Sequence, residues 1–325
     1  MKKLILQTFS ALMFVAAALQ AWPQSCQTRD EIPDQDKTAI ESIAQKVFDQ
    51  ASRADVNGLK ANTIASQQDS IAGVVNDNKA AMDGAHAQLR TSFLLDTGST
   101  GNADGRFFCG VFGASGMNAN GAAFYLPGID AGKYGIVIQD VTGNKGPYAL
   151  TTIFQNAGGW KLAGFQIRPE SASGHDGIWY LQQARDFKNK GQNHNAWFYY
   201  SESWSLMAPV TFMDSTLLGK ITQESNAVLP KDVPVGNKAV SYSANGKTYN
   251  ITEITVFPTD KSFDLSIKYS VPSTSDFNAT LADARGLANA YATQYPELKD
   301  AFTNVWAHAI DPNGADVTGL VTLKK

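Results

Sequence analysis

Apolar and polar positions recur with different periods in different parts of the chain. Between residues 36 and 51, apolar side chains are spaced three and four apart, which predicts an amphipathic helix. They are Ile40, Ile43, Ala44, Val47, Phe48 and Ala51. A weaker pattern of the same period predicts a shorter helix over 70–82. From residue 87 the pattern changes to short runs separated by loops rich in Gly, Asn and Ser, and we expect strands at 88–95, 106–112, 121–126 and 133–141.

Two further apolar runs, 148–154 and 160–167, lie on either side of a polar turn. The turn reads Asn-Ala-Gly-Gly at 156–159, and such a turn between apolar runs is typical of a β-hairpin. We therefore expect an α+β domain over 37–173, with helices first and a curved antiparallel sheet after them. Residues 22–36 are expected to form a polar lead-in.

A helical pattern returns after His175. Residues 179–209 predict two helices with apolar faces, formed by Tyr180, Ala184 and Phe187 in the first and by Trp197, Tyr200, Trp204 and Met207 in the second. Another short helix is expected over 216–227. We expect a helical connector over 174–228 and, because of Pro230 and Pro234, a linker over 229–237.

The last part of the chain, 238–325, has the pattern of a small α+β domain. Strands are expected at 247–257 and 262–271. A helix stopped by Pro296 follows, and strands at 301–310 and 316–323 close the chain. The whole chain is therefore predicted to be of the α+β class.

Parts of this pattern resemble known families. The order of helices, strands and hairpin, together with SRADVNGLK at 52–60 and GGWKLAGFQI at 158–167, resembles an NTF2-like domain, which implies an apolar pocket inside a cone-shaped sheet. The segment 124–138 is more similar to a strand–loop–strand of a prealbumin-like β-sandwich, which is the alternative fold. Residues 179–209 resemble a single tetratricopeptide-type hairpin through Trp179, Ala184, Gly191, Ala196, Tyr200 and Pro209. Through GHDG-WY and AWFYY, the whole chain resembles uncharacterised secreted proteins of soil bacteria, a likeness that implies no activity.

The N-terminus has the features of a secretory signal peptide. Lys2 and Lys3 precede an apolar run that ends in an alanine-rich zone, and we expect cleavage after Ala21, with Ala18 as the alternative. No other stretch approaches the ~18 apolar residues of a membrane span. The mature protein is therefore expected in the periplasm or outside the cell, with no integral membrane segment.

The charge of the chain argues against one class of partner. The formal net charge is −3, and it becomes −5 when the two lysines of the signal peptide are removed. Because the chain also lacks a basic run, we do not expect it to bind nucleic acid.

The chain contains two cysteines, Cys26 and Cys109. Export would allow a disulfide between them, which would stabilise the fold by at most ~4–5 kcal/mol on the chain-entropy model. Lipidation of Cys26 is an alternative, although Pro23, Gln24 and Ser25 do not resemble a lipobox. Two free, unreactive thiols are the third alternative.

Asp96 lies in a sequence that invites a catalytic interpretation. The segment FLLDTGS at 93–99 is similar to the active-site loop of aspartic proteases, in which two such aspartates share one proton. The chain has no second Asp-Thr/Ser-Gly, so a protease would have to be a homodimer. The alternative is a strand that ends in an ordinary turn.

His175 and Asp176 lie at the junction of the first domain and the helical connector. They could form an acid–base pair or contact a ligand in a cleft. Alternatively, Asp176 caps the helix that follows. The other histidines, His86, His194 and His308, lack metal-ligand spacing, and we expect neither a metal nor a cofactor.

The density of aromatic residues at 179–204 favours a compact aromatic core, and the alternative is a stacking surface for a small molecule or a protein. The sequence thus favours an exported, non-enzymatic protein that binds a small molecule or a protein between the sheet domain and the helical hairpin. The candidate ligand-binding residues are His175, Asp176, Trp179, Tyr180, Trp197 and Tyr200. The alternative is a hydrolase that uses Asp96 or the pair His175 and Asp176.

Overall fold

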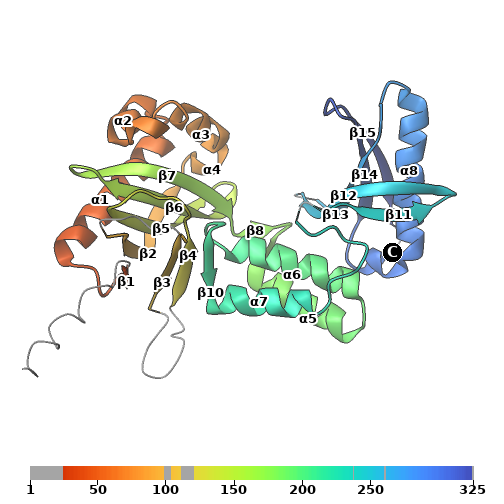
Figure 1. Cartoon of the computed structure of the whole chain (residues 1–325), viewed down its shortest axis with the longest axis horizontal. Helices are drawn as coiled ribbons and strands as arrows, with labels where there is room; N and C mark the ends of the chain where they lie inside the picture. Colours follow the sequence, from red (N-terminus) through yellow and green to blue (C-terminus); the bar gives the residue numbers. More distant parts are fainter. Residues whose placement is uncertain (1–24, 99–103, 111–120, 237, 260, 324–325) are drawn as a thin grey trace, which may run out of the picture.

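The computed structural model describes residues 25–98, 104–110, 121–236, 238–259 and 261–323. The predicted signal peptide lies outside these ranges. Two sheet-containing bodies lie at opposite ends of the molecule, and a helical hairpin lies between them (Figure 1). The predicted α+β class is confirmed. In the described part of the chain, no helix is both long enough and apolar enough to cross a membrane.

The N-terminal body is built on a five-stranded antiparallel sheet. Its strands, in spatial order, are β1 (Ser25–Thr28), β2 (His86–Asp96), β5 (Lys133–Gly143), β6 (Gly146–Asn156) and β7 (Trp160–Pro169). Successive side chains of a strand point to opposite faces. Leu94 and Val137 accordingly face a core shared with the helices, whereas Phe93 and Ile136 face a second core.

Helices cover one face of this sheet. They are α1 (Asp34–Ser52), α2 (Val56–Asn62), α3 (Ile71–Asp77) and α4 (Lys79–Met82), with a 3₁₀ turn, η1 (Ala65–Gln67), between α2 and α3. The predicted stripe of α1 is buried against the sheet, with Ile40, Ala44 and Val47 fully inaccessible. The predicted helix over 70–82 is divided between α3 and α4, and α2 is an additional helix.

A three-stranded sheet covers the other face. It has the order β10 (Met213–Ser215), β4 (Ala122–Tyr125) and β3 (Arg106–Cys109). Phe107 and Phe124 pack against Phe93 and Ile136 of the main sheet, as in the two layers of a β-sandwich. β3 and β4 therefore do not continue the main sheet, in contrast to the single meander expected from the sequence, because their own apolar faces need a second surface. Residues 111 and 112 of the predicted strand lie outside the described residues.

A disulfide joins Cys26 on β1 to Cys109 on β3. Their Cα atoms are 4.8 Å apart, and the bond links residues 83 positions apart in the sequence. Cys109 is fully buried. The bond therefore ties the small sheet to the edge of the main sheet at the strand that the polar lead-in provides.

The helical hairpin consists of α5 (Gly177–Asn189) and α6 (Asn193–Met207), and a two-stranded ribbon of β8 (Ser171–Ala172) and β9 (His175–Asp176) precedes it. After α6 the chain enters β10, which pairs with β4, and then α7 (Thr216–Asn226). The segment before β10 is also anchored, because the Thr151 hydroxyl donates a 3.1 Å hydrogen bond to the carbonyl of Pro209. The hairpin is thus joined to the N-terminal body at β10 as well as at β9.

The C-terminal body is a second five-stranded sheet with one long helix. The strand order is β11 (Val240–Ala244), β12 (Lys247–Pro258), β13 (Phe263–Ser270), β14 (Asn304–Ile310) and β15 (Asp316–Thr322). Only β13 and β14 pair in parallel, because α8 (Phe277–Gln294) and the 3₁₀ turn η2 (Pro296–Asp300) connect them. Gly319 lets α8 lie directly on β15, since a Cβ atom there would be 2.4 Å from the backbone nitrogen of Arg285.

The hairpin and the C-terminal body share one core. Tyr199 and Phe198 of α6 lie edge-on to Phe263 and Phe302, with ring centroids 5.1 and 5.9 Å apart. His194 adds a polar contact, because its Nε2 is 2.9 Å from Asp232 Oδ1, and Tyr291 donates a 2.8 Å hydrogen bond to the same carboxylate. The predicted linker therefore carries a residue that connects α6 to α8.

Candidate functional site

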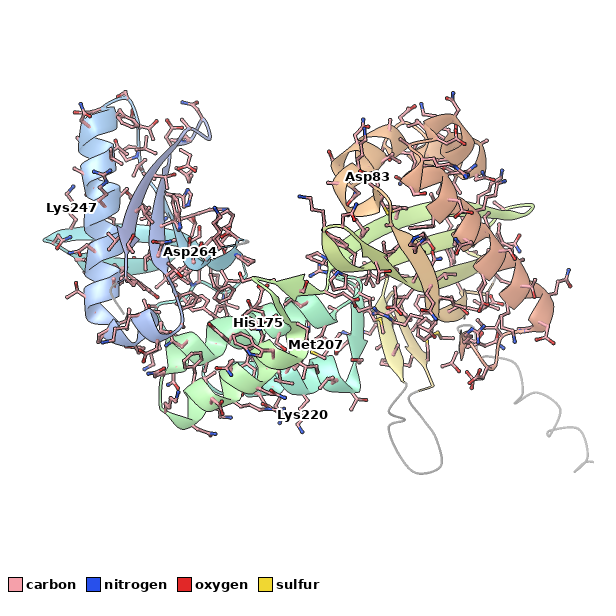
Figure 2. The ribbon with its side chains drawn as sticks, turned by 180° about the vertical axis from the view of Figure 1, so that it is seen from behind. Asp83, His175, Met207, Lys220, Lys247 and Asp264 are labelled. Carbon is pink, nitrogen blue, oxygen red and sulfur yellow. A yellow bond between two sulfur atoms is a disulfide. The ribbon has the colours of Figure 1, made fainter. Side chains whose placement is uncertain are left out.

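His175 and Asp176 do not form a pair. Asp176 Oδ1 accepts a 2.8 Å hydrogen bond from the backbone N–H of Trp179 and so caps α5. The His175 ring instead stacks on the Trp179 ring, with centroids 3.7 Å apart and planes 7° from parallel. Figure 2 places His175 on the hairpin between the two bodies. Each side chain makes its own local contact, and Asp176 has the helix-capping role that was the alternative to an acid–base pair.

Most of the predicted aromatic cluster forms the core. Tyr180 and Tyr200 are 1% and 0% exposed, and their hydroxyls donate to the Ala172 carbonyl and to Glu224. Burial raises the pKa of Tyr200 to about 12. Trp197 is half-buried and lies edge-on to Phe198, with ring centroids 5.0 Å apart. Both rings are therefore almost fully enclosed by protein, as in the compact-core alternative.

Asp96 ends β2 in a turn. Its Oδ1 accepts a 2.8 Å hydrogen bond from the backbone N–H of Gly98, and its backbone pairs with Ser25 and Lys133. This is the turn geometry of the non-catalytic alternative. Ser99 of the protease-like segment lies outside the described residues. Within the described ranges, no three His, Cys, Asp or Glu side chains are grouped so that they could hold a metal.

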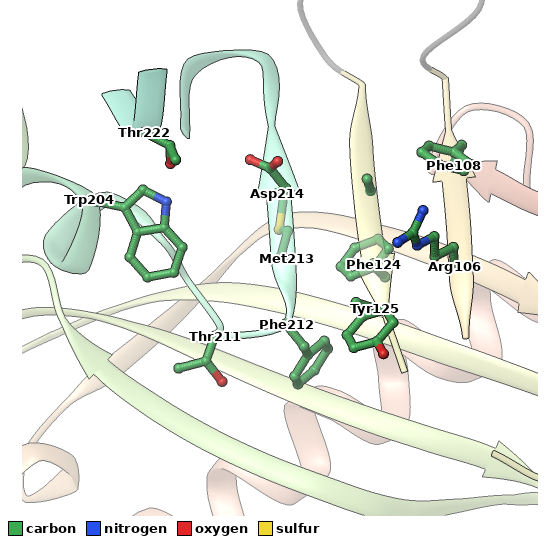
Figure 3. A pocket seen from close by; sticks show the side chains of 11 residues that line it. Arg106, Phe108, Phe124, Tyr125, Trp204, Thr211, Phe212, Met213, Asp214 and Thr222 are labelled. Atoms are coloured by element: carbon green, nitrogen blue, oxygen red, sulfur yellow. The ribbon is translucent and has the colours of Figure 1, made fainter. Parts of the chain in front are cut away.

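A hollow lies between the small sheet and the helical hairpin. It has a volume of about 510 Å³, and Figure 3 shows Trp204 of α6 on one side of β10 and Phe108 of β3 on the other side. A second hollow of about 500 Å³ adjoins it, because Phe108, Ala123 and Asp214 line both. We call the two together the β4 trough.

The alternation of β4 creates this trough. Ala122 and Phe124 point into the core, so Ala123 and Tyr125 point outward, and Gly121 continues the same row. Because Gly121 and Ala123 have little or no side chain, the floor of the trough is low. From Gly121 to Tyr125, this floor is ~13 Å long.

The walls come from segments that are far apart in the sequence. In the register of the small sheet, Ala123 lies between Asp214 on β10 and Phe108 on β3. Tyr125 is next to Arg106 on one side, and its N–H donates a 2.8 Å hydrogen bond to Phe212 on the other. The remaining wall is helical and consists of Trp204, Gly219, Lys220, Thr222 and Gln223.

Aromatic side chains are prominent at one end of the trough. Phe108 and Tyr125 are 52% and 55% exposed, and Trp204 is half-buried. Phe212 is fixed against the core by the Phe124 ring, with centroids 6.4 Å apart. Exposed apolar surface that is gathered in a concave site is typical of a binding site.

Several polar groups in the trough are not used by the fold. Among the described residues, neither the indole N–H of Trp204 nor the hydroxyl of Tyr125 makes a hydrogen bond. Asp214 accepts one hydrogen bond, at Oδ1 from the N–H of Ser215, 2.8 Å long. No hydrogen bond from a described residue reaches its Oδ2, and the residue is exposed. Donors and an acceptor are therefore available to a ligand.

A buried carboxyl lies behind this wall. Glu202, one half-turn before Trp204, is 7% exposed, and burial raises its pKa to about 7, with Arg168 of β7 opposing the shift. Arg168 donates to the carbonyl and hydroxyl of Ser205 at 2.9 and 3.0 Å. The helix that presents Trp204 is thus joined to the main sheet through the bonds from Arg168 to Ser205, and the carboxyl with the raised pKa lies on the same helix.

The sequence predicted ligand binding between the sheet domain and the hairpin, and none of its six candidate residues lines the trough. Of the six candidates, Asp176 borders a smaller hollow beside Glu170 and Met207. Tyr200 borders another that shares Trp204 and Thr222 with the trough. The signal for the floor was the pattern Gly-Ala-Ala-Phe-Tyr at 121–125, in which the outward positions are small. The walls could not be found in this way, because β10 is only three residues long and its pairing depends on the fold.

No protein-family model, curated protein or solved structure matches this chain. The likeness to NTF2-like domains and to a tetratricopeptide hairpin therefore stays a prediction. The function has to be argued from the site.

Proposed function

We propose that this protein binds a small ligand in the β4 trough without catalysing a reaction. The observation that carries the proposal is the combination of a low floor, made by Gly121 and Ala123, with exposed aromatic side chains around it. A volume of about 510 Å³ is typical of small-molecule sites, which also tend to lie where domains meet. Export, as the N-terminus predicts, would place this binding outside the cytoplasm, and the disulfide is compatible with such a location.

The lining residues favour binding over hydrolysis. Asp214 is the one carboxylate among the described residues that line the trough, and no histidine or cysteine lines it. The Ser215 hydroxyl accepts a 3.2 Å hydrogen bond from the N–H of Leu218 and so caps α7. A nucleophile with an adjacent base, which acyl transfer requires, is therefore not assembled here.

The experiment tests this proposal by placing a larger side chain on the floor of the trough. Ala123→Trp adds a large side chain on the outer face of β4, where it does not enter the core. The uncharged, apolar dye N-phenyl-1-naphthylamine serves as the probe, and its fluorescence is titrated with the protein. We expect saturable binding to the unchanged protein and a loss of at least tenfold in affinity for Ala123→Trp.

Thr248→Trp is the matched control, because Thr248 is exposed on β12 of the other body. It should bind the dye as the unchanged protein does. Thermal unfolding establishes that both variants fold. Equal dye binding by all three proteins would place the dye elsewhere and contradict the proposal.

A further inference from the structure

The chemistry of the β4 trough narrows the class of ligand, provided that the trough is a binding site as proposed above. We infer that its ligand is an uncharged oligosaccharide. Three features carry the inference: flat aromatic faces, hydrogen-bonding groups that the fold leaves unused, and charges of both signs along one open groove.

The aromatic faces come from three different elements. Phe108 lies on β3, Tyr125 on β4 and Trp204 on α6. The C–H groups on one side of a pyranose ring form a flat apolar patch that packs against such a face. Aromatic rings contribute large apolar area in a fixed orientation. Rings on several sides of a groove suit a ligand made of several flat units.

The unused polar groups argue against a purely apolar ligand. A lipid chain in the trough would cover the indole N–H of Trp204, the Tyr125 hydroxyl and the Asp214 carboxylate without bonding to them. Each buried polar group left without a partner costs about 1–3 kcal/mol. Sugar hydroxyls both donate and accept, so they can satisfy the donors on Trp204 and Tyr125 and also the acceptor on Asp214.

The charges argue against an ionic ligand. Asp214 lies at the middle of the trough and is shared by its two halves. Lys220 lines one half and Arg106 lines the other. A cationic ligand at Asp214 would also approach the positive charge of Lys220, and an anionic ligand at Lys220 would approach the carboxylate. An uncharged ligand that makes hydrogen bonds avoids both conflicts.

The shape fits a chain of sugars better than a single compact molecule. Two hollows of about 510 and 500 Å³ adjoin along β4, above a floor ~13 Å long. Gly219 of α7 leaves room on the helical wall, since a Cβ atom there would have only the Asp214 carboxylate oxygens near it, at 3.8 Å. The groove can therefore accept adjacent units side by side.

The test begins with a glycan array that presents neutral and charged oligosaccharides of bacterial, plant and animal origin, probed with the full chain. We expect binding to one family of neutral oligosaccharides, measured next in solution by calorimetry. Trp204→Phe should weaken the interaction by about three- to tenfold, since it keeps a ring but removes the N–H. Asp214→Ala should weaken it by about tenfold.

Two conservative variants identify the charge of the ligand. Asp214→Asn keeps an acceptor and removes the charge, and Lys220→Gln removes a positive charge. Both should stay within about threefold of the unchanged protein if the ligand is an uncharged sugar. A loss above tenfold in Asp214→Asn would indicate a cationic ligand, and the same loss in Lys220→Gln an anionic one. Either result would overturn the inference.

The remaining outcomes separate this inference from the proposed function. If the dye binds in the trough, as Ala123→Trp shows, but no glycan on the array binds, the oligosaccharide is wrong and the binding site stands. If peptides from a library bind in the trough and glycans do not, the oligosaccharide is again wrong and the binding site stands. If neither the dye nor a glycan responds to Ala123→Trp, both proposals fail together.

Discussion

Two half-buried tryptophans in this molecule each have an aspartate nearby on a sheet. One tryptophan is hydrogen-bonded to its aspartate, and the other is not. In the C-terminal body, the Trp306 indole donates a 2.9 Å hydrogen bond to Asp264, which also accepts from the N–H and the amide of Asn304 and from Ser262. In the β4 trough, the indole of Trp204 and Oδ2 of Asp214 have no partner among the described residues.

The difference indicates which pair belongs to the fold and which is available to a ligand. Asp264 is 1% exposed, and Figure 2 shows it within the C-terminal body. A carboxylate in such a place is tolerated only when its hydrogen bonds are made. Asp214 is exposed and makes one bond to its own neighbour in the chain. A tryptophan and an aspartate that are hydrogen-bonded to each other stabilise the protein. A tryptophan and an aspartate beside a hollow that lack such bonds can bind a ligand.

The largest expected effect is the difference in stability between alanine variants of the two aspartates. Asp264→Ala leaves the half-buried donors of Trp306, Asn304 and Ser262 without this acceptor. We expect a loss of about 3 kcal/mol in the free energy of unfolding. Asp214→Ala should cost less than about 1 kcal/mol. Urea unfolding of both variants measures this difference. Equal losses would mean that Asp214 also belongs to the fold.

The next effect concerns Glu202, which lies behind Trp204. Its pKa in the native state is about 7 because of burial, so the native carboxyl keeps its proton at pH values where the unfolded chain, with a pKa near 4.5, has lost it. Stability from this group is therefore complete below pH 4.5 and is lost as the pH rises to about 7. The difference is about 3 kcal/mol between pH 4.5 and pH 8.

Glu202→Gln removes this dependence, because glutamine stays neutral. Relative to the unchanged protein, this variant should gain about 3 kcal/mol as the pH rises from 4.5 to 8. Unfolding measured at several pH values for both proteins gives the comparison, and the contributions of all other groups cancel in the difference. Parallel curves would show that Glu202 does not titrate in this range.

The third effect compares two glycines: Gly319, which lies against α8 in the C-terminal body, and Gly219, which lines the β4 trough. Gly319→Ala places a Cβ atom 2.4 Å from the backbone of α8, and such overpacking should cost about 1–3 kcal/mol. Gly219→Ala in α7 meets its nearest atoms at 3.8 Å. It should instead stabilise the protein by up to about 1 kcal/mol through helix propensity, while it narrows the trough.

Gly219→Ala is thus expected to raise the unfolding temperature and weaken the binding of N-phenyl-1-naphthylamine in the same protein. A variant that is more stable and binds more weakly cannot owe its weaker binding to unfolding. Stronger or unchanged binding would show that the wall at Gly219 does not contact the dye.

The sequence predicted the regular elements better than their assembly. The periodicity located α1, the strands of both bodies, the hairpin helices and α8 within a few residues, because each has an apolar face of sufficient length. It did not predict β1, β10 or β11, which are short or polar and are strands only through their pairing with neighbours. The packing of the three-stranded sheet on the main sheet likewise depends on contacts between distant segments.

The candidate site could likewise be predicted only in part from the sequence. A dense run of aromatic residues indicated either a core or a surface, and the sequence could not separate the two, since α6 is apolar on several sides. The fold buries Tyr180 and Tyr200 in the core that the hairpin shares with the C-terminal body, and leaves Trp204 at the trough. Only the position of β10 and β4 decides which aromatic residue faces the hollow.

One spectrum tests the binding claim most directly. The indole N–H signals of Trp204 and Trp306, assigned through Trp204→Phe and Trp306→Phe, can be followed together in ¹H–¹⁵N spectra while N-phenyl-1-naphthylamine is added. We expect the Trp204 signal to shift to saturation and the Trp306 signal, held by Asp264, to stay in place, with no shift of Trp204 in Ala123→Trp. A Trp204 signal that does not move at a saturating dye concentration, or that moves equally in Ala123→Trp, would contradict a binding site in the β4 trough.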